Sequence, residues 1–211
     1  MLTVAEAIKR RRSTRSFTGE PVSRQQVLEI LEAARLAPSA SNSQPWRFVV
    51  VTDPEEKRAL RRLCFGQAFI EQAGVVFVAC ADLSSYSGQT RLKRRQEAVD
   101  AGVLPAASLN DPVFQQMVSA PDPDLRTFIT SATANTYIAV EHMVLMAEAL
   151  GLGSCWVGAI SDREAVKRLL GIPEEMPLLV VLAVGHPAGE RPERPKLPLP
   201  EILLRPLPDD L

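Results

Sequence analysis

Three short segments carry side chains suited to binding a ligand. The first, residues 11–15 (RRSTR), places three guanidinium groups and two hydroxyls within five residues. Arginine binds phosphate oxygens through paired, charge-assisted hydrogen bonds, so this composition suits a phosphate group. The alternative is the solvated end of a helix over residues 3–12, where positive charge is also favourable. The residue types leave both interpretations open.

The other two segments are suited to a flat ligand. Residues 37–46 (APSASNSQPW) are dense in hydroxyl and amide side chains, and they lie between two prolines. Residues 153–158 (GSCWVG) contain glycines that allow the backbone to approach a ring closely. The alternatives are an ordinary helix-to-strand connection for residues 37–46 and a buried strand with Trp156 in the core for residues 153–158.

Several familiar catalytic patterns are missing from the sequence. Gly151-Leu152-Gly153 starts like a G-x-G-x-x-G fingerprint, but Trp156 stands at the third glycine and the segment follows a predicted helix. There is no G-x-x-x-x-G-K-[ST], G-x-S-x-G or H-E-x-x-H pattern. The only two histidines, His142 and His186, predict neither a hydrolytic triad nor a metal site.

Taken in order, the three segments resemble the nitroreductase family of FMN-dependent oxidoreductases. The similarity rests on residues 11–17 (RRSTRSF), Ala34, residues 37–46 and residues 151–158, and it runs along nearly the whole chain. It implies an α+β fold in which helices flank a central mixed, mostly antiparallel sheet. It also implies a homodimer that exchanges extended C-terminal arms and binds FMN at the subunit interface.

The resemblance assigns contacts to individual residues. It places Arg11, Arg12 and Ser13 on the FMN phosphate and ribityl chain, and Arg15 near the pyrimidine edge of the ring. Pro38, Ser39, Ala40 and Asn42, with Gln44 as a further candidate, would reach the flavin held mainly by the other subunit. Trp156, Val157 and Gly158 would lie along the ring, and Gln67 is a further candidate contact. Arg194 and Lys196 would meet the phosphate, with Arg191 as an alternative to Arg194.

The resemblance also implies a ping-pong reaction, in which NAD(P)H reduces the flavin and leaves before a nitroaromatic, quinone or related small-molecule acceptor takes the electrons. The flavin carries the chemistry, so no catalytic side chain and no metal are expected. The alternatives are a dehalogenating or flavin-fragmenting enzyme of the same fold and a flavin-binding protein without turnover. A nucleic-acid binder using residues 9–15 is a further alternative, which the net charge of −1 opposes.

Composition bounds these hypotheses. The chain has 211 residues, 46% of them apolar and 23% charged, which predicts one globular domain over residues 1–211. No apolar run approaches the roughly 18 residues of a membrane span, so no membrane partner is expected. Cys64, Cys80 and Cys155 are isolated and set among apolar residues. This pattern predicts buried free thiols and a cytoplasmic protein.

The elements that must position these segments follow from periodicity and capping. Helices are predicted over residues 3–12 and over residues 130–150. Capping boxes at Ser23–Gln26 and Ser161–Glu164 predict helices that end near Pro38 and Gly171. A further helix is predicted to begin at Pro54, with Asp53 as its cap. Strands are predicted over residues 47–52, 75–81 and 178–184, with a strand or extended turn at 154–159. Residues 84–125 are interpreted as a charged helix near 91–98 followed by a mobile loop or lid. The proline-rich residues 187–211 are interpreted as an extended arm.

Overall fold

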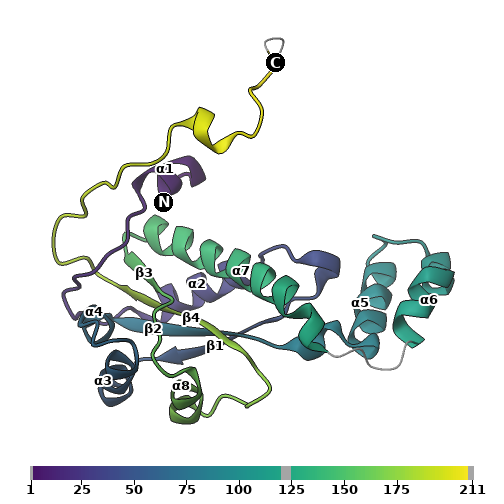
Figure 1. Cartoon of the computed structure of the whole chain (residues 1–211), viewed down its shortest axis with the longest axis horizontal. Coiled ribbons are helices and arrows are strands. Elements are labelled where there is room, and N and C mark those ends of the chain that lie inside the picture. The colour runs from purple at the N-terminus through teal and green to yellow at the C-terminus, as the bar shows by residue number, and fades with distance from the viewer. Residues whose placement is uncertain (1, 120–124, 209–211) are drawn as a thin grey trace.

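A four-stranded sheet lies between two layers of helices in the computed structural model, which describes residues 2–119 and 125–208 (Figure 1). The strands are β1 (Trp46–Val51), β2 (Val75–Ala81), β3 (Gly153–Val157) and β4 (Leu178–Gly185). Their order is β1-β2-β4-β3, and all three neighbouring pairs are antiparallel. The predicted α+β class with a mostly antiparallel sheet is confirmed.

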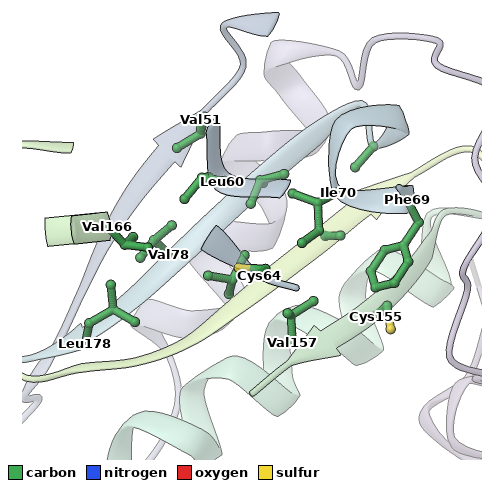
Figure 2. Packing of buried hydrophobic residues seen from close by; sticks show 14 of the residues in the cluster. Val51, Leu60, Cys64, Phe69, Ile70, Val78, Cys155, Val157, Val166 and Leu178 are labelled. Atoms are coloured by element: carbon green, nitrogen blue, oxygen red, sulfur yellow. The ribbon is translucent and has the colours of Figure 1, made fainter. Parts of the chain in front are cut away.

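Alternate residues of β2 enter two separate cores. Val76 and Val78 pack with α3 (Pro54–Leu63), α4 (Phe69–Gln72) and α8 (Arg163–Leu170), in the cluster that Figure 2 shows. Val75 and Phe77 point to the opposite face, which α2 (Arg24–Arg35) and α7 (Ile129–Ala149) cover. Because side chains alternate along a strand and both faces are covered, β2 has the uniformly apolar sequence of a central strand.

The predicted helix start at Ser23 is confirmed and the one at Ser161 is wrong. Ser23 Oγ accepts a hydrogen bond from the backbone N–H of Gln26, whose side chain accepts one from the backbone N–H of Ser23. At α8 the cap is Asp162, which accepts from the Ala165 N–H at 2.8 Å. Ser161 Oγ instead donates to the carbonyl of Leu63 at 2.8 Å, so a contact distant in sequence displaces the cap by one residue.

Residues 83–119 are mainly helical, so the segment after the charged helix contains further helix where a loop was expected. Short 3₁₀ turns at Leu83–Tyr86 and Ala106–Asn110 accompany α5 (Gly88–Asp100) and α6 (Pro112–Ser119). Pro105 and Pro112 stand at helix starts, where a missing N–H leaves no hydrogen bond unmade, so these prolines do not prevent helix formation. Pro121 and Pro123 lie outside the described residues.

The two ends of the chain run beside each other (Figure 1). The first helix, α1 (Val4–Arg10), is capped by Thr3, and the segment after it forms isolated bridges from Ser13 to Ser154 and from Phe17 to Pro187. Between β4 and residue 208 the chain is extended except for a 3₁₀ turn at Leu199–Ile202, as its prolines predict. In the described part of the chain, no helix is both long and apolar enough to cross a membrane.

Candidate functional site

Residues 11–15 lie along the outer edge of β3. The backbone N–H of Thr14 donates to the carbonyl of Ser154 at 2.8 Å, and Thr14 is buried against Gly153, where a Cβ atom would overlap the threonine side chain. Since side chains alternate along an extended segment, an inward Thr14 turns Ser13 and Arg15 outward, and both are exposed. The sheet edge therefore presents these two side chains to the solvent.

The C-terminal arm completes a cavity on this edge. The N–H of Thr18 donates to the His186 carbonyl at 3.0 Å, and the N–H of Ala188 donates to the Ser16 carbonyl at 3.0 Å. The resulting cavity has a volume of about 370 Å³ and is lined by residues 11–16, residues 189–194 and Lys196. Six of the lining side chains are cationic and two are acidic, which makes the cavity a candidate anion site.

Two of the six cations are neutralised within the chain. Arg191 forms a bidentate pair with Glu148 through contacts of 2.6 and 3.1 Å, and the Glu148 side chain is only 3% exposed. Arg12 pairs with Glu193 at 2.9 Å and also donates to two backbone carbonyls. Of the two alternatives in the arm, this arrangement favours Arg194 over Arg191 as an anion ligand.

The other four cations are Arg11, Arg15, Arg194 and Lys196. Across residues 2–119 and 125–208, none of them has a carboxylate within ion-pair distance. Burial raises the pKa of the Cys155 thiol, and the positive charges of Arg15, Arg11 and Arg194 act in the opposite direction. The positive charges of these three arginines, which come from both ends of the chain, therefore all influence Cys155 of β3.

Residues 38–44 form a strained loop on a different part of the molecule. Ser41, Asn42 and Gln44 have φ values of 54°, 52° and 46°, in the left-handed region that residues with a Cβ rarely adopt. Each such conformation costs of order 1 kcal/mol or more and persists only where surrounding contacts enforce it. Strain of this kind concentrates at binding sites, which makes the loop a second candidate.

Buried polar side chains anchor this loop at Ala40. Asn135 of α7 accepts from the Ala40 N–H at 3.2 Å and donates to the Tyr86 hydroxyl at 2.8 Å. Within the loop, the Gln44 N–H donates to Ser39 Oγ at 3.0 Å. Asn135 and Tyr86 were not predicted from the sequence, because only the folded chain shows that they are buried and hydrogen-bonded beside the loop.

The predicted site residues fall into separate groups within one chain. The cavity brings together Arg11, Arg12, Ser13, Arg15, Arg194 and Lys196, along with Ser16, Gly189 and Glu190, which the sequence analysis did not single out. The strained loop holds Pro38, Ser39, Ala40, Asn42 and Gln44, and none of them lines that cavity.

The remaining candidates lie on β3 and next to α4. Trp156 is half-buried with its ring edge-on to Tyr137, Val157 is buried in the core, and Gly158 is exposed just after the strand. Gln67 lies apart from the cavity, and its side-chain amide donates to the Cys64 carbonyl at 2.9 Å.

Comparison with known proteins shows which family the sequence matches. The model of the nitroreductase family matches residues 8–186. A Thermus thermophilus protein named NADH dehydrogenase is 38% identical over 97% of this chain and 96% of its own length. A Bacillus subtilis FMN reductase (NADPH) is 32% identical over 94% of this chain and 71% of its own.

A solved structure shares the fold. A nitroreductase from Exiguobacterium sibiricum, solved in complex with FMN, superposes with a TM-score of 0.82 at 24% identity, covering 96% of this chain and 97% of that one. The family match over residues 8–186 and the 38% identity to the Thermus thermophilus protein lead to one conclusion. The chain belongs to the nitroreductase family.

Proposed function

We propose that the protein is an FMN-dependent enzyme that uses NAD(P)H to reduce nitroaromatic, quinone or related acceptors in two half-reactions at one site. The observation that carries this proposal is the cationic cavity built from both ends of the chain. A phosphomonoester carries about −1.5 to −2 charges near pH 7, which suits a cluster of free cations. Relatives named as NADH dehydrogenase and FMN reductase support the same reaction class.

The donor set of the cavity fits an FMN phosphate. Arg11 and the Ser13 hydroxyl would hold it from the N-terminal segment, and Arg194 and Lys196 would hold it from the arm. Arg12, which is paired with Glu193, would hold the arm in place beside the phosphate.

The ring of the flavin would lie along β3. Trp156 and Gly158 would flank it, and Arg15 would place a positive charge at its pyrimidine edge. Bound FMN would supply hydride acceptance and electron transfer, so the chain needs no nucleophile of its own. The contribution of the protein is position, charge and exclusion of water.

A homodimer would complete the site. The arm exposes a row of large apolar side chains, which a second copy of the chain would cover: Leu197, Leu199, Ile202, Leu204 and Leu207. We propose that two chains exchange arms around a twofold axis and that residues 38–44 of each reach the flavin of the other. Three buried free cysteines fit a reducing compartment, so we place the enzyme in the cytoplasm.

The first test is flavin binding. We expect the purified protein to be yellow and to release FMN on denaturation. Arg11→Ala removes one charge-assisted contact, worth about 1.5–3 kcal/mol, and should weaken FMN binding about 10- to 100-fold. Arg10→Ala, outside the cavity, is the matched control and should leave the Kd within about twofold. Colourless protein that takes up no added FMN would refute the proposal, as would equal effects of the two substitutions.

The shared site has a separate test. One variant carries Arg11→Ala with Arg15→Ala, and the other carries Asn42→Trp in the strained loop. Random re-pairing gives about half heterodimers, each with one intact site, so a mixture of two inactive proteins should regain about a quarter of wild-type sites. A mixture that regains no FMN and no turnover, or a monomer that retains FMN by light scattering, would contradict the dimer.

A further inference from the structure

A second cavity, of about 530 Å³, lies between the strained loop, α5 and α6. It is separate from the phosphate cavity, and the two share no lining residue. Aromatic rings and guanidinium groups make up much of its wall: Tyr86, Phe114, Phe128, Arg91, Arg94 and Arg95. A cavity that is both aromatic and cationic suits a particular class of ligand.

The arginines are held against the rings. The guanidinium carbon of Arg95 is 4.0 Å from the centroid of Phe114, and that of Arg91 is 4.9 Å from the centroid of Phe128. Arg91 Nε also donates to the Tyr86 carbonyl at 2.8 Å, which fixes the direction of its side chain. Cation–π contact uses the face of a guanidinium and leaves N–H groups on its edge free for an anion.

Only one of the three arginines in the wall of this cavity has an ionic partner among the described residues. Arg94 pairs with Glu97 at 2.8 Å, but in the described ranges Arg91 and Arg95 have no carboxylate within ion-pair distance. Among the residues that the structure describes, no acidic side chain lines the cavity. Apolar ring walls lower the local dielectric, so two such charges attract an anion more strongly here than on an open surface.

The cavity also borders the position proposed for the reacting ring. Residues 40–43 of the strained loop form one of its walls, and the proposed function places this loop against the flavin of the partner subunit. A molecule in the cavity would therefore lie next to the flavin. The Tyr86 and Phe128 rings are stacked in parallel with centroids 5.1 Å apart, which offers a flat wall for an aromatic ligand.

We infer that this cavity binds the electron acceptor and selects aromatic acceptors that carry an anionic substituent, with Arg91 and Arg95 as the residues that determine this specificity. The aromatic walls would hold the ring, and the two guanidinium groups would bind the carboxylate, sulfonate or phosphate attached to it. This inference rests on the proposed function.

The anionic substituent is a recognition element and takes no part in the reaction. For a nitroaromatic acid, the first two-electron step is ArNO₂ + NAD(P)H + H⁺ → ArNO + NAD(P)⁺ + H₂O. One N–O bond breaks and its oxygen leaves as water, while the nicotinamide is the reductant. The carboxylate is unchanged, so the proposal needs no further co-reactant.

The test compares two acceptors of nearly equal shape, 4-nitrobenzoate and 4-nitrobenzamide, at saturating NADH. We expect the wild-type holoenzyme to prefer the anion at least about tenfold in kcat/KM, as a charge-assisted contact predicts. Arg95→Gln and Arg91→Gln should each reduce this ratio at least about fivefold. Lys93→Gln, an exposed residue of the same helix that does not line the cavity, makes the same charge change and should leave the ratio unaltered.

Four further results separate the possible outcomes. Calorimetric binding of 4-nitrobenzoate to the oxidised holoenzyme should weaken in Arg95→Gln, which gives a readout independent of turnover. A wild-type ratio near one, or an equal effect of Lys93→Gln, would overturn the inference. A rise in KM for NADH or NADPH with an unchanged acceptor ratio would also overturn it, since the arginines would then bind the phosphates of the donor. If the wild-type protein bound no FMN, or did not reduce neutral quinones, the proposed function itself would be wrong.

Discussion

Breaking the ion pair between Arg191 and Glu148 is expected to have a large effect on the stability of the protein. Glu148 lies in the last turn of α7, where a carboxylate faces the negative end of the helix dipole. Its two oxygens accept hydrogen bonds from the two terminal nitrogens of Arg191. The next nearest cation is Arg10, whose Nε is 3.9 Å away. Arg191→Leu would therefore leave a buried carboxylate with one distant partner.

The cost follows from burial. Breaking a buried pair by removing one partner costs about 3–5 kcal/mol, and the 21% exposure of Arg191 argues for the lower end, about 3 kcal/mol. At 2–4 °C per kcal/mol for a chain of this size, Tm should fall by roughly 6–12 °C. Removing both charges, as in Arg191→Leu with Glu148→Leu, should recover most of this loss because no unpaired buried charge remains.

Thermal unfolding of the apoprotein followed by circular dichroism measures the effect. The matched control is Arg35→Leu, which breaks a pair of similar geometry to Glu32, with contacts of 2.6 and 2.7 Å, on an exposed helix surface. That substitution should shift Tm much less. Equal shifts for Arg35→Leu and Arg191→Leu, or a double variant no better than Arg191→Leu, would refute the reasoning. An FMN titration of the double variant should still show weaker binding, because the arm has lost its anchor.

Three further predictions concern single residues. Burial raises the pKa of Cys64 and of Cys80 to about 11, so neither thiol should react with a maleimide at pH 7 until the protein is denatured, and mass spectrometry of labelled native protein checks this. Hydrogen bonds from arginines lower the pKa of Glu71, which therefore stabilises the folded state above the ordinary carboxyl pKa and ceases to do so as pH falls through its own. Glu71→Gln should flatten the fall in Tm between about pH 5 and pH 3, and an unchanged slope would contradict this. Gly153→Ala should destabilise the protein by about 1–3 kcal/mol through overlap with Thr14, with partial rescue by Thr14→Ala in a urea titration.

Elements fixed by local contacts were predictable from the sequence. Asp53 accepts from two N–H groups of the first turn of α3, and Pro54 begins that helix, so the signal and the structure involve the same few residues. The apolar run of β2 was predicted at its observed bounds because a strand that is buried on both faces has apolar residues at every position.

Features that depend on distant contacts were not predictable. The neutralisation of Arg191 requires Glu148, 43 residues earlier, and the spacing of prolines in the arm carries no sign of it. The strained loop is tied to α7 by the hydrogen bond from the Ala40 N–H to Asn135, which lies 95 residues away in sequence. The cavity near α5 was missed because its rings and arginines come from several elements that meet only in the folded chain.

The arrangement of charge explains why the cationic cavity uses residues from both ends of the chain. Arg11, Arg15, Arg194 and Lys196 repel one another, so a single segment holding all four would tend to splay apart. Backbone hydrogen bonds of residues 14–18 to β3 and to residues 186–188 hold the two segments in place, and the two neutralised arginines add ionic contacts to the arm. The fold therefore maintains this repulsion. If the cavity binds the FMN phosphate as proposed, the dianion would relieve the repulsion, and this relief would supply part of the binding free energy.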